Sequence, residues 1–169
     1  MAILGLFLIL LALLVILVCI GLIVFYYIGA WKMYSKAGQA GWKVLIPYYN
    51  NWVMMVDICD MHIGYFIASI SISVLSVFIS MISTILLGME AYTANYVFQI
   101  ISWIMVIVSY GINFATYYNL AKKFNKGTGW VILTFFFGIV TIPLLGISKK
   151  DVFTDVEVDK HSLFGSIGK

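Results

Sequence analysis

The chain has 169 residues, of which 63% are hydrophobic and 10% are charged, against about 25% charged in a typical soluble domain. A soluble domain of this size must cover its surface with polar groups, so the composition excludes that class and indicates an integral membrane protein. The net charge of +3 fits attraction to anionic lipid headgroups, and we expect no nucleic-acid partner.

Four long segments carry no charged residue. Lys, Arg, Asp and Glu are absent before Lys32 and from residues 61–89, 91–121 and 127–148. Each segment exceeds the roughly 20 residues that cross a hydrocarbon core. Only helices and closed barrels satisfy the backbone in lipid, and the alternation of a barrel strand is missing. We therefore predict an all-α membrane protein with four transmembrane helices, at residues 2–28, 63–87, 96–118 and 130–147 of a single membrane domain, 1–148, with a short polar tail, 149–169.

The first predicted helix, 2–28, resembles a signal peptide only superficially. It lacks a basic start, its apolar run is about twice the usual length, and no small-residue cleavage site follows it. We expect it to be a permanent transmembrane helix.

Two loops rich in lysine, aromatic residues and glycine follow the first and third predicted helices; we call residues 31–50 the first collar and residues 121–130 the second collar. Lysine accumulates in cytoplasmic loops, so both collars are expected in the cytoplasm and the N-terminus outside. A fourth helix that crosses places the C-terminus outside as well, and a re-entrant segment broken near Pro143 is the alternative. The collar residues that are candidates for contact with the membrane interface or with a partner are Trp31, Lys32, Lys36, Gly41, Trp42, Pro47, Tyr49, Asn50, Lys126, Gly129 and Trp130.

The segment 44–60 is too short and too interrupted to span. Pro47 disfavours helix at the residue before it, so we predict an interfacial helix from about residue 47 to residue 58, lying in the headgroup layer. Four residues with metal-ligand chemistry end this segment: Asp57, Cys59, Asp60 and His62. No second cluster completes a site, so we interpret them as a solvated edge and expect neither a metal nor a cofactor.

A polar stripe marks the second and third predicted helices. Its residues recur at helical spacing, which places them on one face of each helix: Ser69, Ser73, Ser76, Ser80, Ser83, Ser102, Ser109, Asn113 and Thr116. Small hydroxyl side chains permit close helix packing, so we expect the two helices to pack along this stripe, with Ser83 opposite Ser102 and Asn113 as a buried amide. The alternative is a polar permeation path.

No pattern for catalysis is present. The sequence contains no phosphate-binding loop, no H-E-x-x-H and no intramembrane aspartate pair, and every lysine lies in a collar or in the tail, away from the serines. We expect a protein that is not an enzyme.

The first collar, W-K-x-Y-x-K-A-G-x-x-G-W-x-x-L-I-P-x-Y-N, the second, A-K-K-F-x-K-G-x-G-W, and a closing P-L-L-G together resemble a family of small bacterial multi-pass membrane proteins of unknown function. The likeness covers residues 30–146, although the serine-rich helices depart from it. Some members carry a signal-peptidase label, but that chemistry needs an extracytoplasmic β-domain for which this chain has no room. The resemblance implies a protein of the bacterial cytoplasmic membrane and no particular reaction.

The sequence therefore predicts a non-enzymatic accessory or scaffold subunit that acts through protein partners or self-association. The first collar and the segment 44–60 are the expected contact region. The alternative is a small oligomeric transporter or channel built around the serine-rich second and third helices.

Overall fold

The computed structural model describes residues 2–89, 91–154 and 156, and all regular structure in this part of the chain is helical. Four helices are long and apolar enough to cross a membrane, which confirms the predicted fold class and makes the chain a multi-pass membrane protein. They are α1 (Ala2–Lys36), α3 (Ile63–Gly88), α4 (Tyr92–Lys123) and α5 (Thr128–Ile147). The first and third of the predicted spans are longer than expected, because α1 and α4 both continue into their collars.

Short helices connect α1 to α3. They are the 3-10 helix η1 (Gly41–Leu45), one turn of α-helix, α2 (Tyr49–Trp52), and the π-helical turn η2 (Val53–Ile58). The predicted interfacial helix is thus present, but it begins at Tyr49, since the chain reverses at Tyr48 with a φ of +62°. Val53 and Ile58 are fully buried, so the segment is packed into the protein. Of the four residues predicted to form a solvated edge, Asp57 and His62 are exposed, Asp60 is partly exposed and Cys59 is buried.

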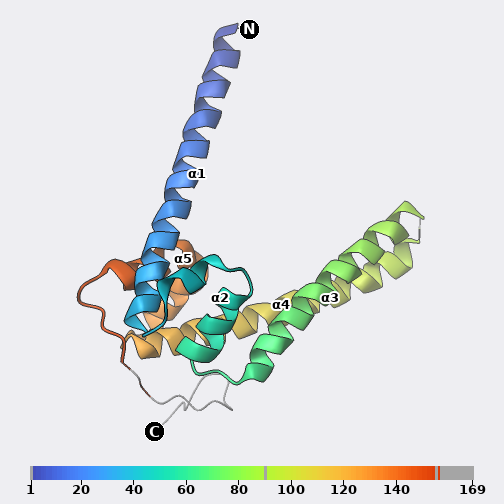
Figure 1. Ribbon diagram of the computed structural model, residues 1–169. Helices are drawn as coiled ribbons and strands as arrows, with labels where there is room; N and C mark the ends of the chain where they lie inside the picture. Colours follow the sequence, from blue (N-terminus) through green and yellow to red (C-terminus); the bar gives the residue numbers. More distant parts are fainter. Residues whose placement is uncertain (1, 90, 155, 157–169) are drawn as a thin grey trace.

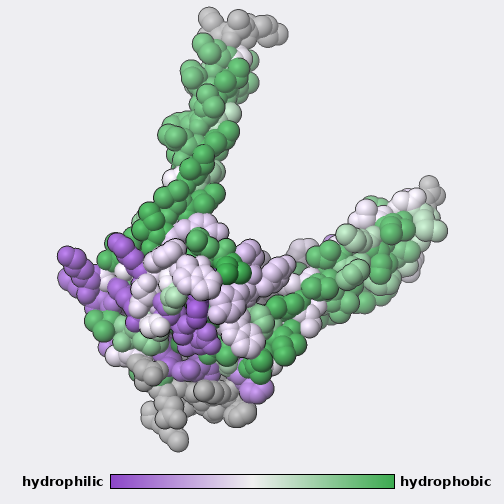
Figure 2. All heavy atoms as spheres, in the orientation of Figure 1, coloured by the Kyte–Doolittle hydropathy of each residue, from purple (hydrophilic) through white to green (hydrophobic). Residues whose placement is uncertain are grey.

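Two arms diverge from one base, as Figure 1 shows. The first arm is the upper part of α1, residues 4–24, and the second arm is the antiparallel hairpin of α3 and α4. The base consists of α1 from Tyr26 onward, the short helices, the end of α4, and α5. Both arms are covered by hydrophobic residues, whereas hydrophilic residues gather on the base (Figure 2).

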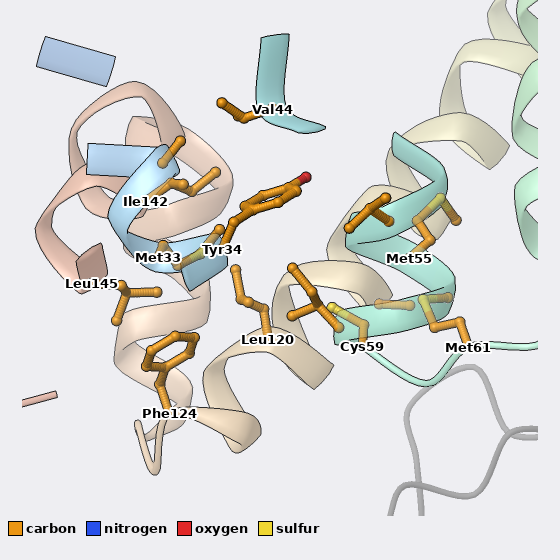
Figure 3. Packing of buried hydrophobic residues seen from close by; sticks show 14 of the residues in the cluster. Met33, Tyr34, Val44, Met55, Cys59, Met61, Leu120, Phe124, Ile142 and Leu145 are labelled. Carbon is orange, nitrogen blue, oxygen red and sulfur yellow. The ribbon is translucent and has the colours of Figure 1, made fainter. Parts of the chain in front are cut away.

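The buried core lies in the base. Tyr34 from α1, Ile58 from η2 and Leu145 from α5 are fully buried, and Leu120 from α4 packs among them (Figure 3). Val44 from η1 covers the same cluster. Five helical segments from distant parts of the sequence therefore share one core.

Helix α5 is bent. Phe137 has non-helical backbone angles, φ −126° and ψ 36°, six residues before Pro143, so the predicted position of the break was wrong. The bend immediately precedes Gly138, and glycine is a poor helix former. Pro143 instead lies in the second half of the helix, where its ring packs directly on Gly29 of α1.

After the bend, α5 runs back toward the side of the base at which it begins. Before the bend, the Phe135 ring contacts the rings of Tyr110 and Phe114 on α4, with centroids 5.9 and 5.6 Å away. After the bend, Gly146 lies against the Gly29 carbonyl, so close that any Cβ on Gly146 would overlap it. Helix α5 therefore rises along α4 and comes back along the last turns of α1.

Candidate docking site at the base

The end of α5 binds the first collar, and the residues that follow it bind the second. The Lys36 ammonium donates to the carbonyl oxygens of Leu145 and Ser148, at 2.7 and 2.5 Å, and to that of Asp151 at 3.0 Å. A cation at a helix C-terminus satisfies carbonyls that have no partner in the helix and is favoured by the helix dipole. A collar lysine thus acts as the C-terminal cap of a helix more than 100 residues away.

The residues after α5 lie against the second collar. Lys126 pairs with Asp151 at 2.5 Å, and the Thr154 backbone N–H donates to the Lys123 carbonyl at 2.7 Å. Burial alone would raise the pKa of Asp151, but hydrogen bonds from Lys126 and Ser148, with the charges of Lys126 and Lys36, hold it below its ordinary value. The predicted tail, 149–169, therefore begins as a packed segment; its residues 155 and 157–169 lie outside the described part of the chain.

Lys123 is the charged group at the centre of the base. Its side chain is 1% exposed and forms an ion pair with Asp60, whose side chain is 27% exposed. An unpaired ammonium at this depth would carry a large desolvation cost. The pair therefore joins the end of α4 to the end of the segment 44–60.

The four residues with metal-ligand chemistry each have different surroundings. Asp57 is exposed, Asp60 is paired with Lys123, and the His62 Nδ1 accepts from the Gly64 N–H at the start of α3. Cys59 is buried with its thiol 3.5 Å from the Thr116 carbonyl, and burial raises the pKa of the thiol. Within the residues that the structure describes, no group of three such side chains could hold a metal ion.

The first collar presents an exposed aromatic surface, which we define as Trp31, Trp42, Leu45, Tyr48 and Tyr49; each of these side chains is at least 38% exposed. The Trp42 and Tyr49 rings stack with centroids 6.4 Å apart, and the Lys43 ammonium lies 5.7 Å from the centre of the Tyr49 ring. Figure 2 shows pale residues of intermediate hydropathy on the base beside the foot of α1.

The aromatic surface is held rigidly on the core. Gly41 packs on the Trp31 ring so closely that a Cβ there would overlap it. The buried Tyr34 hydroxyl is within hydrogen-bond distance of both Asn50 oxygens, at 2.9 Å from the backbone carbonyl. Of the other candidates, Lys32 and Pro47 are exposed, whereas Lys36 is used as the cap described above.

The second collar presents less surface. Lys126 lies over the Trp130 ring, 5.1 Å from its centre, and is already paired with Asp151. Gly129 is exposed, and the buried Trp130 indole N–H has no hydrogen-bond partner within the part of the chain that the structure describes. The structure therefore distinguishes the two collars: the first offers side chains outward and the second mainly holds the base together.

The polar stripe only partly faces the other helix of its hairpin. Ser69, Ser73 and Ser76 donate to carbonyls of their own helix, and Ser80 and Ser102 line an open groove of about 380 Å³ on the hairpin surface. Ser83 is buried, but its hydroxyl meets Asn95, about two turns closer to the hairpin end than the predicted Ser102. The stripe is therefore not a continuous line of hydrogen bonds between the two helices.

The buried amide of α4 is not the one that the sequence predicted. Asn113 is exposed and donates to the Ser109 carbonyl at 2.9 Å, so its predicted burial was wrong. The buried amide is Asn119, which is 0% exposed and has no partner at either side-chain atom among the described residues. It lies one turn after Thr116, which is buried in the base, so extending the stripe by three residues would have found it.

Comparison with protein-family models, curated proteins and solved structures finds no match for the chain. Lys123 and Lys126 are paired, Lys36 caps α5, and the Cys59 thiol is buried. The outward-facing groups of the first collar include aromatic rings packed on the core. Such an arrangement is suited to binding a surface or a partner.

Proposed function

We propose that the chain is a non-enzymatic accessory or scaffold subunit of the bacterial cytoplasmic membrane, acting through a protein partner or a second copy of itself. The observation that supports this is the aromatic surface of the first collar. Tyr and Trp supply large contact area at low entropic cost and are enriched at interfaces. Here they stand exposed on a core that fixes their positions.

Two residues of this surface provide the test. Replacing Trp42 and Tyr49 together by Ala removes the stacked rings, and we expect the native complex to dissociate on size exclusion after mild extraction. Trp103→Ala is the matched control, because Trp103 is 61% exposed on α4, far from the collars. A complex that survives the double substitution as well as the control would refute the docking role.

We further propose an orientation with the N-terminus outside and both lysine collars in the cytoplasm. The packing of the residues after α5 on Lys36, Lys123 and Lys126 supports a re-entrant α5, with three crossings and the C-terminal side in the cytoplasm. The positive-inside rule agrees, since Lys149 and Lys150 then join the cytoplasmic lysines.

Single cysteines test this orientation in a chain lacking Cys19, because Cys59 is buried. A membrane-impermeant thiol reagent on intact cells should label Thr93→Cys at the hairpin end of α4 but neither Thr128→Cys nor Lys149→Cys. In inverted vesicles the pattern should reverse. Labelling of Lys149→Cys together with Thr93→Cys in intact cells would show that α5 crosses.

The groove on the hairpin supports a second candidate function, an oligomeric transporter or channel. It is lined by Ser76, Ser80, Thr84 and Ser102, and copies arranged around this face would enclose a polar path. Water-soluble thiol reagents should then reach Ser80→Cys but not the lipid-facing control Phe78→Cys. Absence of labelling at both positions would exclude this candidate.

A further inference from the structure

A crevice of about 400 Å³ lies between α1, α4 and α5. Tyr26 lines it from α1, Tyr117 lines it from α4, and the side of α5 around the bend completes the wall with Thr134, Gly138, Ile139 and Ile142. The first helix and the last two helices thus form one cavity, and its size falls within the range of small-molecule sites.

The wall is mixed: Phe135, Ile139 and Ile142 are its apolar side, and the hydroxyl-bearing side chains of Tyr26, Tyr117 and Thr134 make it polar. The Tyr117 hydroxyl lies 3.9 Å from the position that a Cβ on Gly138 would occupy, which is an ordinary contact, so a methyl group would fit there and a larger side chain would enter the crevice. Thr134 donates its proton to the Trp130 carbonyl at 2.8 Å, which leaves the phenol groups as the hydrogen donors of the crevice. The crevice is therefore suited to a ligand that combines a hydrocarbon part with a hydrogen-bond acceptor.

The surroundings of the crevice are those of a bilayer boundary. Tyr26 follows directly after the exposed apolar residues 4–24, which must lie in hydrocarbon, and tyrosine is enriched at the boundary with the headgroups. Phe136 and Phe137 at the bend are 72% and 59% exposed. The molecules that meet this level of the membrane carry acyl chains joined by esters to glycerol.

We propose that this crevice binds one glycerophospholipid, with the upper part of an acyl chain along Ile139 and Ile142 and an ester carbonyl accepting from the Tyr117 hydroxyl. The proposal rests on the membrane placement in the proposed function and gives that placement a specific ligand. It is independent of the docking role of the aromatic surface.

A phosphatidylethanolamine with a diazirine on its acyl chain, reconstituted with the protein in vesicles, is the probe. Photolabelling should map to the peptides that contain Tyr26, Tyr117 or Thr134. Gly138→Leu should reduce this labelling more than fivefold, because its side chain fills the crevice. Gly111→Leu is the control, since a Cβ there meets nothing within 4 Å and α4 is exposed at that point.

Misfolding of Gly138→Leu would be revealed by reaction of the Cys59 thiol, which is buried in the folded protein. In that case a second variant keeps the test decisive. Tyr117→Phe removes only the hydroxyl, and one hydrogen bond corresponds to roughly a two- to tenfold loss of labelling. The ether-linked analogue of the probe should show no such loss. Equal labelling in wild type and Tyr117→Phe, or no labelling at the crevice in wild type, would overturn the proposal.

The cysteine labelling of Thr128→Cys and Lys149→Cys distinguishes failure of this proposal from failure of the proposed orientation. Photolabelling at Tyr117 with Lys149→Cys outside would keep the lipid site and reject the re-entrant α5. The reverse result would keep the orientation and reject the lipid site.

Discussion

The base and the first arm are both helical, but their apolar side chains are packed in opposite ways. In the base, Tyr34, Leu120 and Leu145 are at most 1% exposed. Along the first arm every large apolar side chain from Leu4 to Val24 is at least 41% exposed. Along α1, burial against protein is thus confined to the turns that belong to the base.

The difference shows where each region obtains its stability. Lipid tails are as apolar as leucine, so a helix in the bilayer gains little from burying its side chains against another helix. Residues in the base belong to collars, bends and helix ends, whose backbone groups and charges need partners. The base therefore depends on specific contacts, and the arms depend on the bilayer and on their own helical hydrogen bonds.

The largest expected effect comes from Gly146→Leu. Its side chain would overlap the Gly29 carbonyl, and because the obstacle is backbone we expect a loss of about 4 kcal/mol, beyond the usual cost of overpacking. The measurement is the thermal midpoint in detergent, with Cys59 thiol reactivity reporting on the base. Gly21→Leu, on the first arm with nothing within 4 Å, should change neither value. Equal effects of the two substitutions would abolish the distinction between the two regions.

Lys123→Met should come next, with a loss of about 3 kcal/mol, because it leaves the Asp60 carboxylate partly buried without its partner. Adding Asp60→Asn should restore part of the loss in denaturant unfolding, since the unpaired charge is then removed. If the double variant is no more stable than Lys123→Met, the ion pair does not explain the effect.

A smaller effect should depend on pH through Asp151. Its pKa is lower in the folded protein than the ordinary value of 3.8, so the contribution of its carboxylate is complete above that value. The contribution is lost as the pH falls through the lowered folded pKa. The stability difference between wild type and Asp151→Asn, measured from pH 6 to pH 2.5, should therefore shrink at the acidic end. A difference that is constant with pH would contradict the assignment.

The smallest effect is expected on the second arm. Ser73→Ala removes an exposed hydroxyl that bonds only within its own helix at 2.8 Å, so the free energy of unfolding should change by less than about 0.5 kcal/mol. A loss above about 1 kcal/mol in vesicles would show that this face of the hairpin contacts another protein.

The long helices of this protein could be predicted from its sequence, because a segment that crosses the bilayer must be uncharged over a length set by the thickness of the hydrocarbon core. The path of α5 could not, since an apolar run around Phe137 has the same composition whether it crosses or bends back. The position of Pro143 misleads for a related reason: a proline ring can pack on Gly29 within a helix as well as interrupt one.

The aromatic residues of the first collar were identified from sequence as candidates for contact, because Trp and Tyr next to lysine are typical of interfaces. Which collar lysine is buried could not be predicted. Lys36, Lys123 and Lys126 have the same local setting, and only the three-dimensional approach of Asp60 and Asp151 gives them different roles. The sequence did not identify Gly29 and Gly146 as important residues of the base. Each is required to be small only because the other packs against it in three dimensions.

The length of α1 has a mechanical consequence. Its 35 residues form a rod of about 52 Å, well beyond a hydrocarbon core of about 30 Å, without a proline to act as a hinge. A membrane that becomes thinner increases the tilt of such a helix. Trp31 lies on α1, and Gly41 of the first collar packs against its ring. A change in the tilt of α1 would therefore also turn the stacked rings of the first collar. The thickness of the bilayer would then set the direction in which these rings point.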